Sequence, residues 1–121
     1  MKYACMIYYD EHTLDTLSPS EYDALVREAL AYDQELRESG HFILGQALES
    51  ARSAAIVRPR AGGRITTSDG PLLETKEQLG GFVLIEARDL NEAIQLAARI
   101  PPARFGCVEV RPVKRLEPTE R

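Results

Sequence analysis

Two helix-start signals, each flanked by apolar strand-like segments, constrain the fold of this chain most strongly. The segment Ser18–Glu21 combines a capping residue, a proline at the first helical position and a glutamate that can close a capping box. Apolar residues then recur three and four positions apart until Gly40, which ends the helix. The segment Asp89–Glu92 starts a second helix, which Pro101-Pro102 must stop. The expected buried face of the first helix consists of Tyr22, Leu25, Val26, Ala29, Leu30 and Leu36.

The segments around these helices have the composition of β-strands. They cover residues 2–9, 42–48, 53–58, 64–67, 82–87 and 106–113. A loop at 59–63 joins the third and fourth of them as a hairpin. The order is that of an α+β, ferredoxin-like βαββαβ fold with an extra central hairpin, in a single domain over residues 1–121.

Charge and hydropathy exclude several classes of partner. A formal charge of −4, with no basic cluster, argues against binding to nucleic acid. No apolar run approaches the ~18 residues of a membrane span, and the N-terminus is too short and too soon charged for a signal peptide. We therefore expect a cytoplasmic protein. Cys5 and Cys107 each lie in an apolar run and are expected to be buried thiols, although a bridge stays open if the first and last strands pair.

One face of the predicted sheet has no cover. The two helices can pack on only one side, while the other side also carries apolar side chains. In so short a chain, the simplest cover is the same face of a second copy. The sequence therefore predicts a homodimer.

The segment from Thr67 to Phe82 holds most of the candidate functional residues. Asp69-Gly70-Pro71 is a turn signal, in which Asp69 either caps the turn or acts as a general base or ligand anchor. Glu74, Lys76 and Glu77 form either a surface charge cluster or part of a binding surface. Gly80-Gly81 is typical of a close backbone approach or a bulge, not of a phosphate-binding loop.

Few other residues suggest chemistry. His41 lies between the first helix and the next strand, where it either caps helical carbonyls or points toward the open face of the sheet. Tyr8, in the first strand, is either a core residue or a hydroxyl at a cavity. No cluster of histidine, cysteine or carboxylate side chains has the spacing of a metal site. We expect neither a metal nor a bound cofactor.

The run from Asp69 to Phe82, DGPLLETKEQLGGF, resembles the signature of the YCII-related proteins of the DGPF type. Leu72 stands where the namesake motif has phenylalanine. The resemblance implies a dimeric α+β barrel, and some members are encoded beside extracytoplasmic-function sigma factors. Further matching segments are Met1–Tyr3, Ser18-Pro19, Ser39–His41, Asp89–Ala93, Arg99–Pro101 and Val108–Pro112.

The resemblance also suggests residues for an active site. Classical YCII proteins have been proposed to use a His and Asp pair with the histidine on the first helix, and this helix has no histidine. Asp10 or Asp69 could supply the acid, and His41 a displaced imidazole.

The leading hypothesis is a homodimer that binds a small molecule in a cleft between the helices, the sheet and the segment from Asp69 to Gly81. Whether it is an enzyme stays open; acid–base chemistry would use Asp69 as base and His41 or Lys76 as proton donor or anion anchor. The candidate ligand-binding residues are Asp10, Tyr8, Gly70, Pro71, Glu74, Lys76 and Gly81. The alternatives are a regulatory protein that contacts a sigma factor through an exposed loop, and a motif that only stabilises the dimer.

Overall fold

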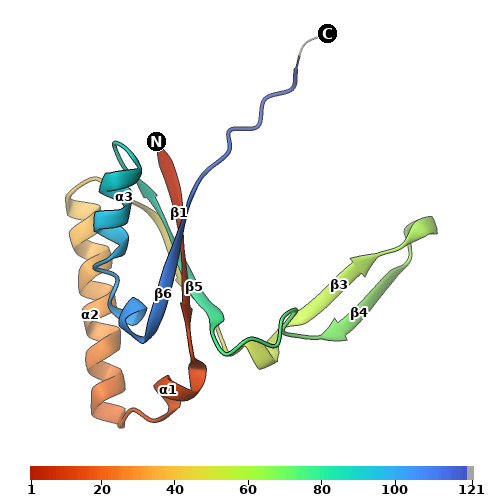
Figure 1. The fold of residues 1–121 in the computed structure, drawn as a ribbon, viewed down its shortest axis with the longest axis horizontal. Helices are drawn as coiled ribbons and strands as arrows, with labels where there is room; N and C mark the ends of the chain where they lie inside the picture. The colour runs from red at the N-terminus through yellow and green to blue at the C-terminus, as the bar shows by residue number, and fades with distance from the viewer. Residues whose placement is uncertain (120–121) are drawn as a thin grey trace.

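The computed structural model describes residues 1–119 and consists of a sandwich-like body from which a long β-hairpin arm projects (Figure 1). The body contains a four-stranded sheet and the helices; the arm is a separate two-stranded sheet. Short 3₁₀ helices occupy Ala51–Ser53, Ala61–Gly63 and Pro101–Phe105. The other elements are β1 (Lys2–Tyr9), α1 (Glu11–Asp15), α2 (Pro19–Glu38), β2 (Phe42–Ala47), β3 (Ala55–Pro59), β4 (Ile65–Asp69), β5 (Gln78–Glu86), α3 (Leu90–Ala97) and β6 (Gly106–Pro112).

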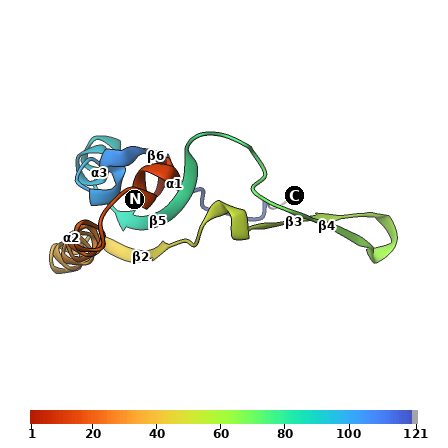
Figure 2. The same cartoon turned by 90° about the horizontal axis from the view of Figure 1, so that it is seen from below.

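The body sheet confirms the predicted ferredoxin-like α+β fold. Its strand order is β2-β5-β1-β6, with every pairing antiparallel. Helices α2 and α3 cover one face of this sheet (Figures 1 and 2). None of the helices in residues 1–119 combines the length and apolar character that a membrane span needs.

Both helices begin where the sequence predicts. The Ser18 hydroxyl accepts a hydrogen bond from the Glu21 amide at 3.2 Å, and the Glu21 carboxylate accepts one from the Ser18 amide at 2.9 Å, which completes a capping box. At α3, Asp89 accepts from the Glu92 amide at 2.9 Å, whereas the Glu92 carboxylate reaches one residue further back, to the amide of Arg88. The second box is therefore not reciprocal.

The core lies between the sheet and the two helices. Tyr3, Cys5 and Ile7 point from β1 to the helices, and Leu36 and Ala93 meet them from α2 and α3. The predicted buried face of α2 is partly wrong, because Tyr22, Val26 and Leu30 are 50%, 38% and 62% exposed. These three residues form a stripe beside the one that faces the core, which consists of Leu25, Tyr32 and Leu36.

The arm formed by β3 and β4 is the predicted hairpin, with strand ends shifted by up to two residues. Asp69 belongs to β4 and pairs with Ala55, so it does not lie in a free turn. Apart from Ile56, the residues of both strands are exposed. The arm projects from the body on the side of the sheet opposite the helices (Figures 1 and 2).

The cysteine prediction is half right. Cys5 is buried, but Cys107 is exposed, and both thiols are free. Strands β1 and β6 do pair, yet the register sets Cys5 opposite Val110 and Cys107 opposite Tyr8. Because side chains alternate between faces along a strand, the two sulfurs lie on opposite faces of the sheet. A bridge between them is excluded in this fold.

Candidate functional site

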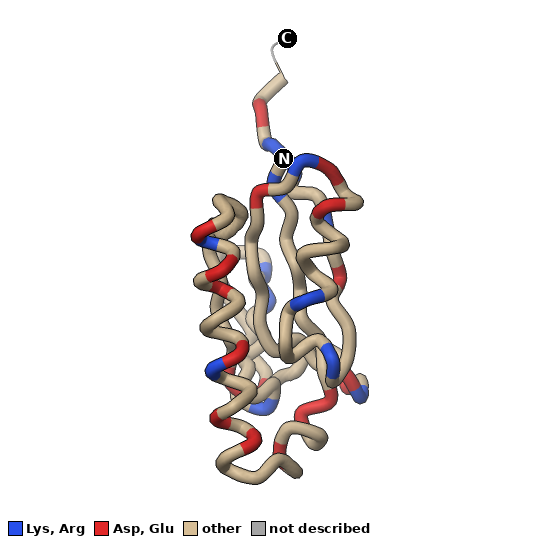
Figure 3. Tube along the Cα trace, turned by 90° about the vertical axis from the view of Figure 1, so that its left-hand side faces the viewer, with Lys and Arg blue, Asp and Glu red and all other residues tan. Residues whose placement is uncertain are grey.

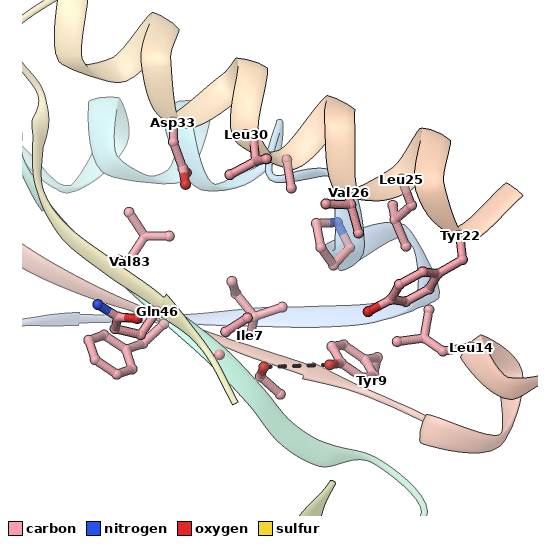
Figure 4. A pocket seen from close by; sticks show the side chains of 17 residues that line it. Ile7, Tyr9, Leu14, Tyr22, Leu25, Val26, Leu30, Asp33, Gln46 and Val83 are labelled. Carbon is pink, nitrogen blue, oxygen red and sulfur yellow. Dashed lines mark hydrogen bonds between the residues drawn. The ribbon is translucent and has the colours of Figure 1, made fainter. Parts of the chain in front are cut away.

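A cavity lies between α2 and the sheet, and we call it the α2 cleft. Its volume is about 330 Å³, at the lower end of the range for small-molecule sites. One wall is the exposed stripe of α2, with Val26 and Leu30; the other is formed by β1, β2 and β5 (Figure 4). Most of the lining is apolar, so the cleft is suited to an apolar molecule.

Bare backbone forms part of the sheet wall. Gly45, Gly80 and Gly81 line the cleft, and Gly80 is the residue at which the register between β1 and β5 shifts. A Cβ on Gly81 would lie 2.9 Å from the Gln46 carbonyl oxygen, closer than real Cβ atoms come to backbone. The predicted role of this glycine pair in a close approach and a bulge is confirmed, and Gly81 lies in the lining of the cleft.

Polar groups occupy the two ends of the α2 cleft. Asp33 points into it from α2 at one end, and Tyr9 and Tyr22 lie at the other (Figure 4). The Tyr9 hydroxyl donates to the Gly80 carbonyl at 3.5 Å. Burial raises the pKa of Tyr9, and the charge of Glu11 adds to this. Tyr9 therefore presents a neutral hydroxyl at physiological pH.

Asp33 is the charged side chain in this lining. Burial raises the pKa of its carboxyl above the ordinary value, and the nearby charge of Arg37 only opposes this. Arg37 itself stacks on the Phe42 ring, with 4.3 Å between its Cζ and the ring centroid. Within residues 1–119, the Asp33 carboxylate has no ion pair and accepts no hydrogen bond, which makes it an unpaired charge at an apolar wall.

Three of the predicted ligand-binding residues meet in a second, more open hollow, which we call the loop groove. Tyr8, Asp10 and Lys76 line it, together with Glu77 and Cys107, around about 710 Å³. The Asp10 carboxylate accepts from the His12 amide at 3.0 Å and so caps α1. Burial raises the pKa of Cys107, and Glu77, whose carboxylate accepts from the thiol at 3.8 Å, adds to the effect. The groove is wide, and its lining mixes these charged side chains with apolar ones such as Leu73 and Phe105.

The start of the signature run forms the base of the arm. The Gly70 amide donates to the Ala54 carbonyl at 2.8 Å, and the Gly70–Pro71 peptide bond is cis. A Cβ on Gly70 would lie 2.7 Å from that of Ala54, so a side chain does not fit there. Asp69 and Glu74 are exposed, and within residues 1–119 their carboxylates accept no hydrogen bond. These residues set how the arm leaves the body.

His41 lies away from the arm. Its Nδ1 is 2.8 Å from the Glu86 carbonyl oxygen, at the end of the sheet where β2 begins. The arm leaves from the far end of β2, and that strand spans about 16 Å. Asp69 and His41 are thus not brought together in one subunit, so a site that used both would need two copies of the chain. Within residues 1–119, no three metal-binding side chains converge.

A family model for the YCII-related domain matches residues 1–117. The chain belongs to the YCII-related family. It is also similar to the uncharacterised protein R00369 of Rhizobium meliloti (strain 1021), with 36% identity over 122 residues that cover 99% of this chain and 98% of that protein. Because that relative is itself uncharacterised, what this YCII-related protein does has to be argued from its own side chains.

Sequence reasoning about this YCII-related chain missed Asp33, Tyr9 and Tyr22 as site residues. A signal was present for Asp33, because it continues the spacing of Val26 and Ala29 along one stripe of α2. A carboxylate in line with apolar residues four and seven positions before it interrupts an otherwise apolar stripe. Such an interruption indicates either the solvent edge of the helix or a charge placed at a cavity.

Proposed function

We propose that this YCII-related protein binds a small, mainly apolar molecule in the α2 cleft. The observation that carries the proposal is the combination of an apolar cavity of about 330 Å³ with one inward carboxylate and two tyrosine hydroxyls. Small-molecule sites have this composition: apolar walls for affinity and a few polar groups for orientation. The exposed stripe of Tyr22, Val26 and Leu30 would be covered by such a ligand.

A fluorescent probe tests this proposal. N-phenyl-1-naphthylamine is uncharged at neutral pH and brightens when it enters an apolar site. We expect it to bind the wild-type protein, and Ala29→Phe, which fills the cleft from α2, to abolish the signal. Ala24→Phe is the matched control, because Ala24 is exposed on α2 and does not line the cleft. Equal binding by both variants would refute the α2 cleft as the site.

We infer in addition that the protein is a homodimer paired through the open face of the sheet. That face carries Met6 and Tyr8 from β1 and Phe82 and Leu84 from β5, all only half-buried in the isolated chain. The arm projects on the same side, and an isolated two-stranded hairpin is marginally stable in water. A second copy would cover both features.

Charge distribution favours the same arrangement. Residues 52–68, the arm and its base, hold four arginines and no acidic residue. The rest of the chain has 11 basic and 19 acidic residues, a formal charge of −8. Helix α2, on the face of the sheet opposite the arm, alone carries six acidic and two basic residues, so the charge of α2 adds to the overall negative charge of the body and does not lie at the proposed interface (Figure 3). An arm from one copy would therefore be attracted to the body of the other.

Met6→Glu tests the dimer, because it places a charge in the middle of the proposed interface. Light scattering is expected to give twice the chain mass for the wild type and the chain mass for the variant. Gln95→Glu, on the exposed side of α3, is the control and should stay dimeric. Amides of residues 55–69 should exchange slowly in the dimer and rapidly in the Met6→Glu monomer. A monomeric wild type would overturn the inference.

A regulatory role is the second candidate, with a sigma factor docked on residues 70–77. The observation in its favour is that residues 72–77 are all exposed, including Leu72 and Leu73 at 64% each. Binding of a purified extracytoplasmic-function sigma factor, lost in Leu72→Asp/Leu73→Asp, would support it. Failure of the wild-type protein to bind would count against it. The catalytic roles of Asp69 and His41 remain predictions that depend on the dimer.

A further inference from the structure

The α2 cleft holds a charge that the protein leaves without a partner. Among the side chains that line it, only Asp33 is charged at neutral pH; the other polar groups are the hydroxyls of Tyr9 and Tyr22 and the amide of Gln46. Burial of a carboxylate beside apolar groups is unfavourable unless a cation or donors compensate it. In residues 1–119, no side chain forms an ion pair or a hydrogen bond with the Asp33 carboxylate, and the charge of Arg37 offsets its burial only in part.

Two neighbouring carboxylates on α2 form ion pairs, in contrast to Asp33. Glu28 pairs with Arg104 at 2.6 Å, and Glu35 pairs with Arg99. Arg37, one turn after Asp33, stacks on the Phe42 ring and donates to the Gln34 side chain, and it forms no ion pair with Asp33. Arg99 and Arg104 both belong to the segment that follows α3, and in residues 1–119 neither forms an ion pair with Asp33, which points into the cleft.

The length of the cleft limits the shape of what can fill it. Asp33 and Tyr22 are eleven residues apart on α2, which corresponds to about 16 Å along the helix axis. Between them lie the side chains of Val26, Ala29 and Leu30 on one wall and the bare backbone of the glycines on the other. A molecule that satisfies these surroundings has a positive end, an elongated apolar body and no second charge.

We propose that the ligand of the α2 cleft is a monocationic amine with an apolar body, and that Asp33 is its counter-ion. This inference rests on the proposed function. The ammonium group donates hydrogen bonds to the Asp33 carboxylate at one end, and the apolar body lies beneath α2. The far end reaches the rings and hydroxyls of Tyr9 and Tyr22 (Figure 4). An anionic ligand would be repelled by Asp33, and a neutral one would leave that carboxylate uncompensated.

Competition for the fluorescent probe tests the ligand class. 4-Phenylbutylamine, 4-phenylbutanol and 4-phenylbutyrate share an apolar body and differ only in the charge of one end. We expect the amine to bind the wild-type protein about 10- to 100-fold more tightly than the alcohol, the range of a hydrogen bond to a charged group. The carboxylate should bind most weakly.

Asp33→Asn assigns the preference to this side chain. The variant keeps the shape of the residue and should bind amine and alcohol equally, while Asp23→Asn, an exposed acid on the same helix, should keep the wild-type preference. Equal affinity for amine and alcohol in the wild type would overturn the amine proposal and leave the proposed function standing. No binding of any of the three compounds or of the probe would count against both. The wild-type comparison decides the class even if Asp33→Asn does not fold.

Discussion

Replacing Tyr32 with phenylalanine removes one hydroxyl that ties α2 to α3. The side chain is 7% exposed, and its hydroxyl donates to the Leu96 carbonyl at 2.6 Å. The ring would stay in the core, and Arg99, with its Cζ 4.8 Å from the ring centroid, keeps its stacking partner. The substitution therefore isolates a single hydrogen bond between the two helices.

The expected loss follows from what happens to the acceptor. The Leu96 oxygen also accepts from the Arg99 amide at 3.3 Å, so removal of the hydroxyl does not leave it without a partner. The cost is then that of the hydrogen bond alone, about 1 kcal/mol of unfolding free energy, rather than the larger penalty of an unsatisfied buried group. For a chain of this size, that lowers Tm by about 4 °C.

The effect should depend on pH with a definite sign. Burial raises the pKa of Tyr32; the charge of Arg99 opposes this and that of Glu35 adds to it. A phenol with a raised pKa donates throughout the range below its ordinary pKa near 10 and loses this contribution as the pH rises through the folded-state value. The difference between wild type and Tyr32→Phe should be constant from pH 7 to 9 and shrink in alkali.

Urea denaturation followed by circular dichroism measures this loss. Tyr22→Phe is the control, because Tyr22 lies on the same helix, is 50% exposed and makes no side-chain hydrogen bond within the described part of the chain. It should change stability by less than about 0.5 kcal/mol. A loss for Tyr32→Phe no larger than that of the control would refute the reasoning, since it would mean that the α2–α3 bond contributes nothing.

Three further substitutions have expected outcomes. Asp33→Asn should raise the Tm of the ligand-free protein at pH values above the folded-state pKa of Asp33, which burial raises. The gain in Tm should disappear below about pH 3.8, where the acid is protonated in both the folded and the unfolded state. An unchanged Tm at pH 8 would contradict this prediction. Gly81→Ala should cost about 1–3 kcal/mol through overpacking against the Gln46 carbonyl, while Gly62→Ala, with open space around it but φ at +75°, should cost less. Glu77→Gln should accelerate alkylation of Cys107 at pH 8, because it lowers a pKa that burial and Glu77 both raise; an equal rate would contradict it.

The sequence was sufficient to predict the helices and strands, but not which of their residues are buried or exposed. Capping residues and apolar spacing are local, so α2, α3 and the order of strands around them were predictable. The exposure of Cys107 was missed because its run was judged by apolar composition, like that of Cys5. The alternation along β6 was the better signal, since Cys107 shares a strand face with Glu109 and Arg111, while Val108 and Val110 point to the core.

The residues of the candidate site were also hard to predict from local sequence. Asp69 attracted interest because turn residues surround it, and the structure sets it at the base of an exposed arm. Asp33 had no motif around it, yet it lies in an apolar cleft because α2 crosses the sheet beside β2 and β5. A carboxylate acquires an unusual environment from tertiary packing, and motifs record only neighbours along the chain.

The signature run connects the two features on which the proposals rest. It begins at the base of the arm with Gly70 and ends with Gly80 and Gly81 in the wall of the α2 cleft. If a second copy holds the arm, it also fixes the strand that forms this wall. The Met6→Glu monomer should therefore bind the fluorescent probe more weakly than the wild type, although Met6 faces away from the cleft; measured at equal chain concentration, an unchanged affinity would show that dimer and cleft are independent.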